Sequence, residues 1–91
     1  MFRPMAVARS GTVTVRFFAR YAELVGREEA AVCVALPATV ADVVRRVREE
    51  LPGARQLPER PLAAVNLKHV KLDACVGDGD EVAFLPPVAG G

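Results

Sequence analysis

One amphipathic segment in the middle of the chain constrains the fold more than any other feature. Apolar residues recur there at helical spacing and form one stripe: Val40, Val43, Val44, Val47 and Leu51. Thr39 precedes the stripe and Asp42 follows three residues later, as in a capping box, and Pro52 and Gly53 end the pattern. Because β-branched valines are poor helix formers, this helix needs a packed layer against its stripe.

Alternating segments on both sides of the helix supply that layer. Four segments show the two-residue period of half-buried strands, and they span residues 12–17, 28–36, 68–72 and 81–85. Residues 62–66 are expected to form a further short strand. A sheet with one main helix packed on one face is an α+β fold. The strand residues expected in its core are Val13, Val15, Phe17, Val32, Val34, Val70, Val82 and Phe84.

The segments between the strands carry ordinary turn chemistry. A short helix over residues 20–25 ends at Gly26, and a proline-bounded loop covers residues 55–61. Residues 77–80 (GDGD) have the residue chemistry of a turn. They are not interpreted as a calcium loop, because the twelve-residue ligand spacing is missing. We therefore expect one domain over residues 12–87, a loose leader over 1–11 and a tail over 88–91.

Composition and charge exclude several classes of function. The 91 residues carry a net charge of +1, without the basic stripe of a nucleic-acid or membrane-surface binder. No apolar run approaches the roughly 18 residues of a membrane span, and the first residues are too interrupted for a signal peptide. We expect a cytoplasmic protein that binds neither nucleic acid nor membranes.

The reactive side chains are scattered along the chain. Cys33 and Cys75 form no CxxC motif and His69 is the only histidine, so we expect no metal site and no intrinsically bound cofactor. We interpret both cysteines as small apolar residues. A Ser-His-Asp triad would need Ser10, the only serine, which lies in the leader. The expected globular part therefore carries no catalytic constellation.

The chain ends on two glycines, which have a specific chemical interpretation. The carboxylate of Gly91 has no neighbouring Cβ, so a narrow channel can close around it. The residues that lead to it are Pro86, Pro87, Val88, Ala89 and Gly90. The prolines end the last strand and favour an extended exit, and four further residues reach about 13 Å. A frayed chain end is the alternative, but the pattern favours a flexible tail that delivers its carboxylate into a partner.

Several segments resemble the small, sulfur-carrying subunit of molybdopterin synthase. They span residues 15–19 (VRFFA), 23–26 (ELVG), 63–66 (AAVN), 78–84 (DGDEVAF) and 86–91 (PPVAGG). The resemblance covers residues 13–91 and implies the ubiquitin-like β-grasp fold, a mixed sheet whose first and last strands are parallel. The chain departs from its relatives at Leu85, where an aromatic is common, and at His69, where a larger apolar residue is common.

The resemblance implies a mechanism centred on Gly91. An activating enzyme that uses ATP and magnesium would adenylate the terminal carboxylate, and a sulfur donor would convert it to a thiocarboxylate. The tail would then enter the large synthase subunit and give its sulfur to cyclic pyranopterin monophosphate, in molybdenum cofactor biosynthesis. The chain would be a non-catalytic carrier, because the catalytic groups would lie on the large subunit.

Strand parity predicts a docking face on the side of the sheet away from the helix. Its outward apolar residues are Phe18, Ala83 and Leu85, and its rim charges are Arg16, His69 and Lys71. We expect this face to bind the partner proteins, with the rim charges steering an acidic surface.

Three other functions share the fold and the glycine end. They are a thiamine-pathway sulfur carrier, a ubiquitin-like modifier that forms isopeptides with lysines, and a non-covalent β-grasp binding module. Thiamine-pathway carriers are usually shorter and lack the long loop between helix and strand found here. A modifier predicts conjugates on target proteins, and a binding module predicts that the tail is dispensable.

Overall fold

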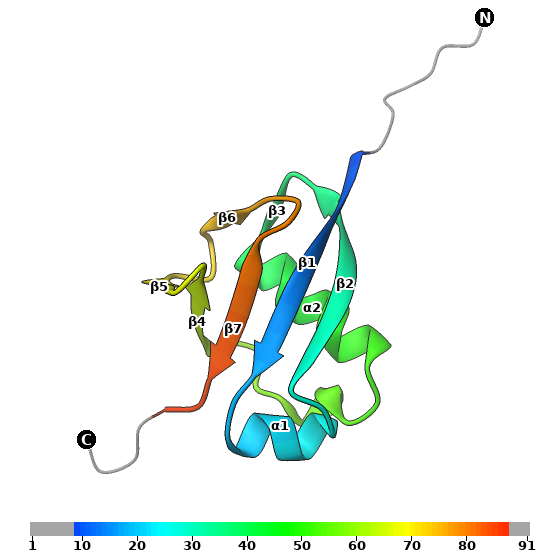
Figure 1. Ribbon diagram of the computed structural model, residues 1–91, viewed down its shortest axis with the longest axis vertical. Coiled ribbons are helices and arrows are strands. Elements are labelled where there is room, and N and C mark those ends of the chain that lie inside the picture. Colours follow the sequence, from blue (N-terminus) through cyan, green and yellow to red (C-terminus); the bar gives the residue numbers. More distant parts are fainter. Residues whose placement is uncertain (1–8, 88–91) are drawn as a thin grey trace, which may run out of the picture.

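The computed structural model of the chain describes residues 9–87 (Figure 1). Their elements in chain order are β1 (Arg9–Phe17), α1 (Arg20–Val25), β2 (Glu29–Leu36), β3 (Ala38–Thr39), α2 (Val40–Glu50), η1 (Ala54–Gln56), β4 (Leu62–Val65), β5 (Lys68–Val70), β6 (Cys75–Val76) and β7 (Glu81–Leu85). Residues 1–8 of the expected leader and the whole expected tail, 88–91, lie outside the described residues.

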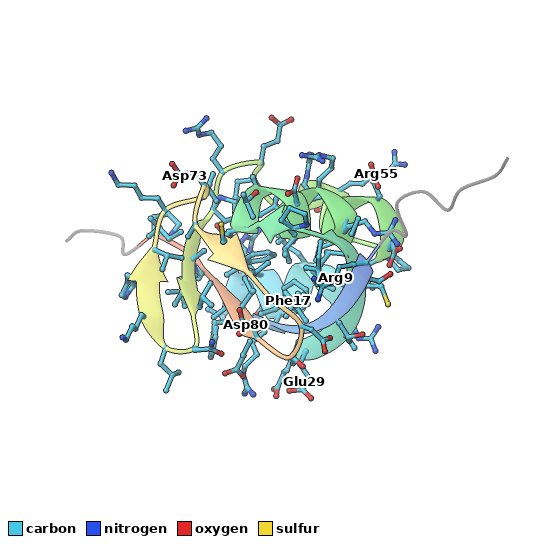
Figure 2. All side chains as sticks on the ribbon, turned by 90° about the horizontal axis from the view of Figure 1, so that it is seen from above. Arg9, Phe17, Glu29, Arg55, Asp73 and Asp80 are labelled. Atoms are coloured by element: carbon cyan, nitrogen blue, oxygen red, sulfur yellow. The ribbon has the colours of Figure 1, made fainter. Side chains whose placement is uncertain are left out.

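The main sheet has five strands in the order β2-β1-β7-β4-β5, with β1 and β7 parallel to each other. Val15 pairs with Val82 in this parallel ladder, and Phe17 pairs with Phe84. The other pairings, β1 with β2, β4 with β7 and β4 with β5, are antiparallel. α2 lies across one face of the sheet, as Figures 1 and 2 show. The expected mixed sheet and its parallel first and last strands are therefore confirmed.

The core lies between the sheet and α2. Both layers contribute large side chains that are fully buried: Val13, Val15, Val40, Val43, Val47, Val82 and Phe84. Burial stabilises the fold by roughly 1.5–3 kcal/mol for each such side chain. The expected core is confirmed except at Val70, which is only partly buried because β5 is an edge strand.

α2 begins with the predicted capping box. The Thr39 hydroxyl accepts a hydrogen bond from the Asp42 N–H at 3.3 Å, and the Asp42 carboxylate accepts one from the Thr39 N–H at 2.9 Å. The bond from the Thr39 backbone holds the pKa of Asp42 below its ordinary value, because it stabilises the charged carboxylate. The Val40 N–H donates to the Ala74 carbonyl at 3.0 Å, so a second donor of the first turn is satisfied.

The short helix α1 has its predicted boundaries, whereas η1 forms where a loop was expected. α1 spans Arg20–Val25 and ends at Gly26, whose φ of 85° is left-handed, as a helix-terminating glycine requires. The expected loop over residues 55–61 contains most of η1, and its proline residues follow that turn. Within residues 9–87, no helix is long and apolar enough to cross a membrane.

Two parts of the fold differ from the sequence expectation. β1 begins at Arg9, three residues before the expected start, so residues 9–11 pair with β2 and do not belong to the leader. The alternating pattern did not reveal these residues, because Gly11 has no side chain to mark its face. In the structure Gly11 is packed closely, since a Cβ there would lie 3.0 Å from the Leu36 side chain. The small sheet of β3 and β6, in which Ala38 pairs with Val76, was also not expected. Strands of two residues are too short to show a period.

Candidate functional site

The last described strand leads toward the chain end from the middle of the sheet. β7 ends at Leu85, which pairs with Leu62 of β4, and Pro86 and Pro87 follow. Because β1 and β4 flank β7, the chain leaves a central strand and not an edge. The predicted tail residues Val88, Ala89, Gly90 and Gly91 lie outside the described residues, so the role of Gly91 stays a prediction.

An apolar patch lies beside this exit on the sheet face opposite α2. Phe18 is 40% exposed and Leu62 is 52% exposed. Leu85 is partly buried and pairs with Leu62. Phe17 pairs with Phe84 in the parallel strands, so the next residues, Phe18 and Leu85, are neighbours at the ends of these strands. We call Phe18, Leu62 and Leu85 the exit patch. Solvent-exposed apolar groups gathered in this way mark contact surfaces in small proteins.

Sequence reasoning found two members of the exit patch and missed the third. Phe18 and Leu85 were expected to face outward, and the structure places them so. Leu62 was assigned only to a strand, although it has the outward parity of Ala64. The signal that could have found it is the pairing of β4 with β7, which brings Leu62 opposite Leu85.

Arg16 lies among two carboxylates and an aromatic ring on the outer face. Its Nη1 lies 3.3 Å from a carboxylate oxygen of Glu29 and 3.3 Å from one of Glu81, and its guanidinium carbon lies 5.9 Å from the ring centroid of Phe18. Two carboxylates therefore surround its single positive charge. The Arg16 side chain is still 41% exposed, so its expected contact with a partner stays a prediction.

Two of the remaining expected docking residues, Ala83 and His69, lie in one row across the same face. Ala83 of β7 pairs with Arg16 on one side and with Ala64 on the other, and Ala64 pairs with His69 of β5. His69 is exposed at this edge, and Lys71 is exposed just after β5. The structure thus brings Arg16, Ala83 and His69 into one row, but Lys71 lies outside it and lines a groove together with residues of α2.

The acidic turn before β7 is a structural element. Asp78 accepts a hydrogen bond from the Thr12 N–H at 2.8 Å, and Asp80 accepts one from the Gly77 N–H at 2.8 Å. Asp80 also accepts from the Asn66 side chain at 3.0 Å. These bonds tie the turn to β1 and to the β4–β5 turn. The interpretation as a plain turn is confirmed.

The reactive side chains do not gather. Cys33 and Cys75 are both exposed and free, which differs from small apolar residues packed in a core. His69 is exposed on β5. Among residues 9–87, no group of three or more His, Cys, Asp or Glu side chains could hold a metal ion. The described part of the site is therefore an apolar patch beside a chain exit, without a cluster of reactive side chains among residues 9–87.

A ubiquitin-like β-grasp domain with an apolar patch at the exit of its last strand defines the class of this protein. The chain belongs to the ThiS family, whose sequence profile matches residues 15–91. It is 40% identical over 80 residues to the molybdopterin synthase sulfur carrier subunit of Escherichia coli K12, covering 87% of this chain and 99% of that protein. The resemblance to that family of subunits is therefore confirmed.

Solved structures agree with this assignment. Small archaeal modifier protein 1 of Haloferax volcanii superposes with a TM-score of 0.75 at 27% identity, covering 86% of this chain and 99% of that one. A chain of the complex of subunits 1 and 2 of molybdopterin-converting factor from Helicobacter pylori 26695 gives a TM-score of 0.60 at 26% identity, covering 88% and 99%. The fold thus occurs both in a protein named as a modifier and in a two-subunit complex.

Proposed function

We propose that this chain is the sulfur-carrier subunit of a molybdopterin synthase. The observation that carries the proposal is the near full-length similarity to a curated carrier subunit, which extends over 99% of that relative. The family match includes the terminal Gly90-Gly91 pair. A carrier of this kind needs a stable domain, a chain exit and a docking surface, and the fold supports each of these needs.

The reacting group in this proposal is the carboxylate of Gly91. An activating enzyme with ATP and magnesium adenylates it: a carboxylate oxygen attacks the α-phosphorus and pyrophosphate leaves. A sulfur nucleophile from a donor then attacks the acyl carbon, and AMP leaves. With hydrosulfide as this nucleophile, the new C–S bond replaces the C–O bond to AMP and the sulfur loses its proton. The chain then ends in a thiocarboxylate without a change of oxidation state. Its soft anion is a better nucleophile than the original carboxylate.

The catalytic groups in this proposal belong to the partners. Residues 9–87 gather no metal-ligand cluster, and their one histidine is exposed. The large synthase subunit receives the tail and holds cyclic pyranopterin monophosphate, to which the sulfur passes. The complex of two converting-factor subunits from Helicobacter pylori supports a large-subunit partner for this chain. The exit patch is the surface proposed to meet that partner first, because it adjoins the end of β7.

A protein modifier is the second candidate, and one observation favours it. The structural neighbour from Haloferax volcanii is named small archaeal modifier protein 1. A modifier shares the adenylation step, but a lysine amine attacks the acyl carbon in place of sulfur. The two functions therefore differ in the product of the activated Gly91 and not in the fold.

Reconstitution separates these candidates. The thiocarboxylated chain, freed of ATP and activating enzyme, is mixed with the cognate large subunit and cyclic pyranopterin monophosphate. A carrier should produce molybdopterin and lose about 16 Da as hydrolysis returns its carboxylate. A parallel mixture of the unmodified chain keeps ATP and the activating enzyme and contains added proteins. Conjugates in that mixture, with no molybdopterin formed in the first one, would support the modifier and contradict the carrier. A thiamine-pathway carrier would likewise fail to produce molybdopterin with this large subunit.

A further inference from the structure

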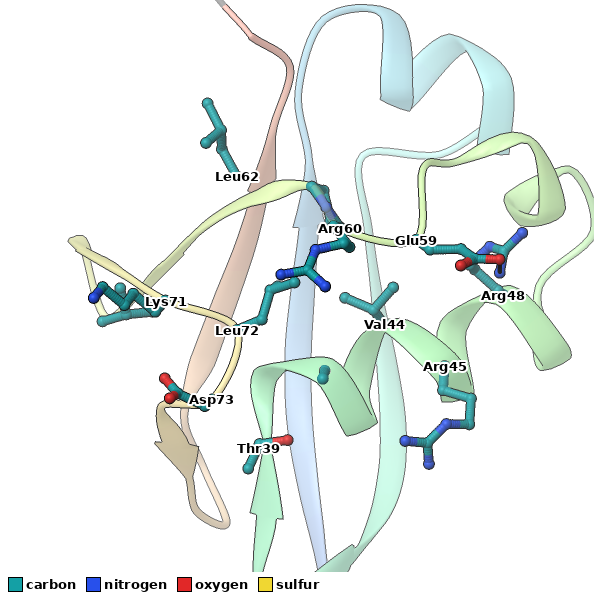
Figure 3. A pocket seen from close by; sticks show the side chains of 13 residues that line it. Thr39, Val44, Arg45, Arg48, Glu59, Arg60, Leu62, Lys71, Leu72 and Asp73 are labelled. Atoms are coloured by element: carbon teal, nitrogen blue, oxygen red, sulfur yellow. Dashed lines mark ion pairs between the residues drawn. The ribbon is translucent and has the colours of Figure 1, made fainter.

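A groove runs along the open side of α2, away from the strands β1 and β2. It encloses about 960 Å³ between α2, the segment that leads into β4, and the segment that follows β5. Its floor is apolar, with Val44 from α2, Pro61 before β4 and Leu72 after β5. Figure 3 shows the guanidinium of Arg60 lying over this floor beside Leu72.

The groove carries more positive than negative charge. Its basic residues are Arg45, Arg48, Arg60 and Lys71, and its acidic residues are Glu59 and Asp73. Arg45 pairs with Asp42 at 3.0 Å, and Arg48 pairs with Glu59 at 3.6 Å. No ion pair within residues 9–87 involves Arg60 or Lys71. The groove therefore keeps unneutralised positive charge above an apolar floor.

The groove is continuous with the exit patch. Leu62 lines the groove, and the same residue pairs with Leu85 at the end of β7. Figure 3 shows Leu62 at the end of the groove, next to the strand that leads to the chain end. A protein that covers the exit patch thus needs only to pass over Leu62 to reach Arg60.

We propose that this groove binds an acidic, partly apolar segment of the protein that receives the tail, which is the large subunit if the proposed function holds. Apolar side chains of that segment would cover Leu72 and Leu62, and its carboxylates would approach Arg60 and Lys71. Charge complementarity carries the choice of occupant: a basic segment would meet unpaired cations, and an uncharged one would leave Arg60 without a partner as its surroundings lose water.

The test compares single charge reversals of two arginines in the same part of the chain. Arg60→Glu places a negative charge in the groove. Arg55→Glu makes the same change on an exposed side chain outside it, and Figure 2 shows Arg55 pointing away from the domain. Both variants change the net charge equally, so long-range electrostatics are matched. Affinity for the cognate large subunit is measured at low and high salt, and each variant's fold is checked by its melting temperature.

We expect Arg60→Glu to weaken binding by about tenfold at low salt and Arg55→Glu by less than about twofold. The difference in affinity between the two variants should become smaller at about 0.5 M salt, because screening weakens exposed charge pairs. Amide hydrogen exchange of residues 70–73 should slow in the complex, which a general charge effect would not produce. Should Arg60→Glu melt early, the neutral Arg60→Gln tests the same contact with a smaller effect.

Several results would overturn the proposal. Equal affinities for Arg60→Glu and Arg55→Glu, or unchanged exchange at residues 70–73, would show that the groove stays open in the complex. A defect confined to thiolation by the activating enzyme would assign the groove to that enzyme and contradict the assignment to the large subunit. Failure of the wild-type chain to bind the large subunit would overturn the proposed function as well. If the wild type binds and the two variants behave alike, only the groove proposal is wrong.

Discussion

The ring of Phe84 meets the ring of Phe17 edge to face, with centroids 6.1 Å apart and ring planes at 66°. The two residues are a register pair of the parallel strands β1 and β7, and both are almost completely buried. Leu85 and the two prolines follow Phe84 directly. This aromatic pair therefore fixes the point at which the chain leaves the sheet.

Phe84→Ala should lower the free energy of unfolding by about 3–5 kcal/mol, because it removes a buried aromatic and leaves a cavity. Urea unfolding followed by circular dichroism measures the loss. Phe84→Leu retains most of the buried volume and should cost clearly less. A loss below about 1 kcal/mol for Phe84→Ala would show that the contact does not hold β7 in place.

Gly53 should tolerate no side chain. Its φ is +83°, and a Cβ there would lie 2.3 Å from the Leu24 carbonyl oxygen. Gly53→Ala combines backbone strain with this clash, so we expect a loss of more than about 2 kcal/mol in unfolding free energy. Gly79 has a φ of +89° with nothing within 4 Å of its Cβ position, so Gly79→Ala isolates the strain alone. Equal losses for the two variants would contradict the clash.

Asp42 should make the stability of α2 depend on pH. Its pKa is lowered in the folded state, so its contribution is present above the unfolded pKa near 4 and is lost as pH falls through the folded value. Asp42→Asn should cost on the order of 1 kcal/mol at pH 7, a modest value because the side chain is 38% exposed. The difference from wild type should shrink toward about pH 2.

Denaturant unfolding across this pH range measures the difference at Asp42. Glu49→Gln is the matched control, because Glu49 is an exposed carboxylate of the same helix without a hydrogen bond or ion pair among residues 9–87. A difference between wild type and Asp42→Asn that is the same at pH 7 and pH 2 would rule out the charged capping box.

Phe18→Ala should weaken the complex with the large subunit by about 1–3 kcal/mol, since exposed aromatic anchors dominate contact surfaces. The fold should stay stable, because Phe18 is 40% exposed. Leu67→Ala is the matched control: Leu67 is 88% exposed but lies at the turn between β4 and β5, outside the exit patch. Calorimetric titration measures the affinity of each variant for the large subunit. If Phe18→Ala binds the large subunit and the activating enzyme as tightly as the wild type does, the exit patch does not contribute to either complex.

The sequence predicted the main elements because their side chains alternate or recur over several turns. The valine stripe located α2 within one residue at its C-terminal end, and the turn before β7 was recognised by its aspartates and glycines. Both signals depend on side-chain chemistry that is local in sequence. For the same reason, the sequence predicted the capping box of Thr39 and Asp42, and the structure contains both of its hydrogen bonds.

The parts that the sequence did not predict depend on contacts between distant segments. The pairing of Ala38 with Val76 joins segments far apart in the chain, and neither strand is long enough to show a period. The ion pairs of Arg16 were not predicted, because Glu29 and Glu81 reach it from two neighbouring strands. Leu62 became part of the exit patch only through the pairing of β4 with β7.

The central claim concerns Gly91, which lies outside the described residues and is tested chemically. Deleting Gly91 would move the carboxylate by about 3.3–3.6 Å, and a misplacement of about 1 Å can cost a hundredfold in rate. Appending one alanine is a stricter change, because the Gly91 carbonyl then becomes part of a peptide bond. Neither change touches residues 9–87, so both variants should fold as the wild type does.

The most direct measurement is the intact mass of the chain after incubation with the cognate activating enzyme, ATP, magnesium and a sulfur source. The wild type should gain about 16 Da as sulfur replaces one carboxylate oxygen, and the variant with an alanine appended after Gly91 should gain nothing. The account would be contradicted if the extended variant were thiolated and supported molybdopterin synthesis as well as the wild type, without prior trimming.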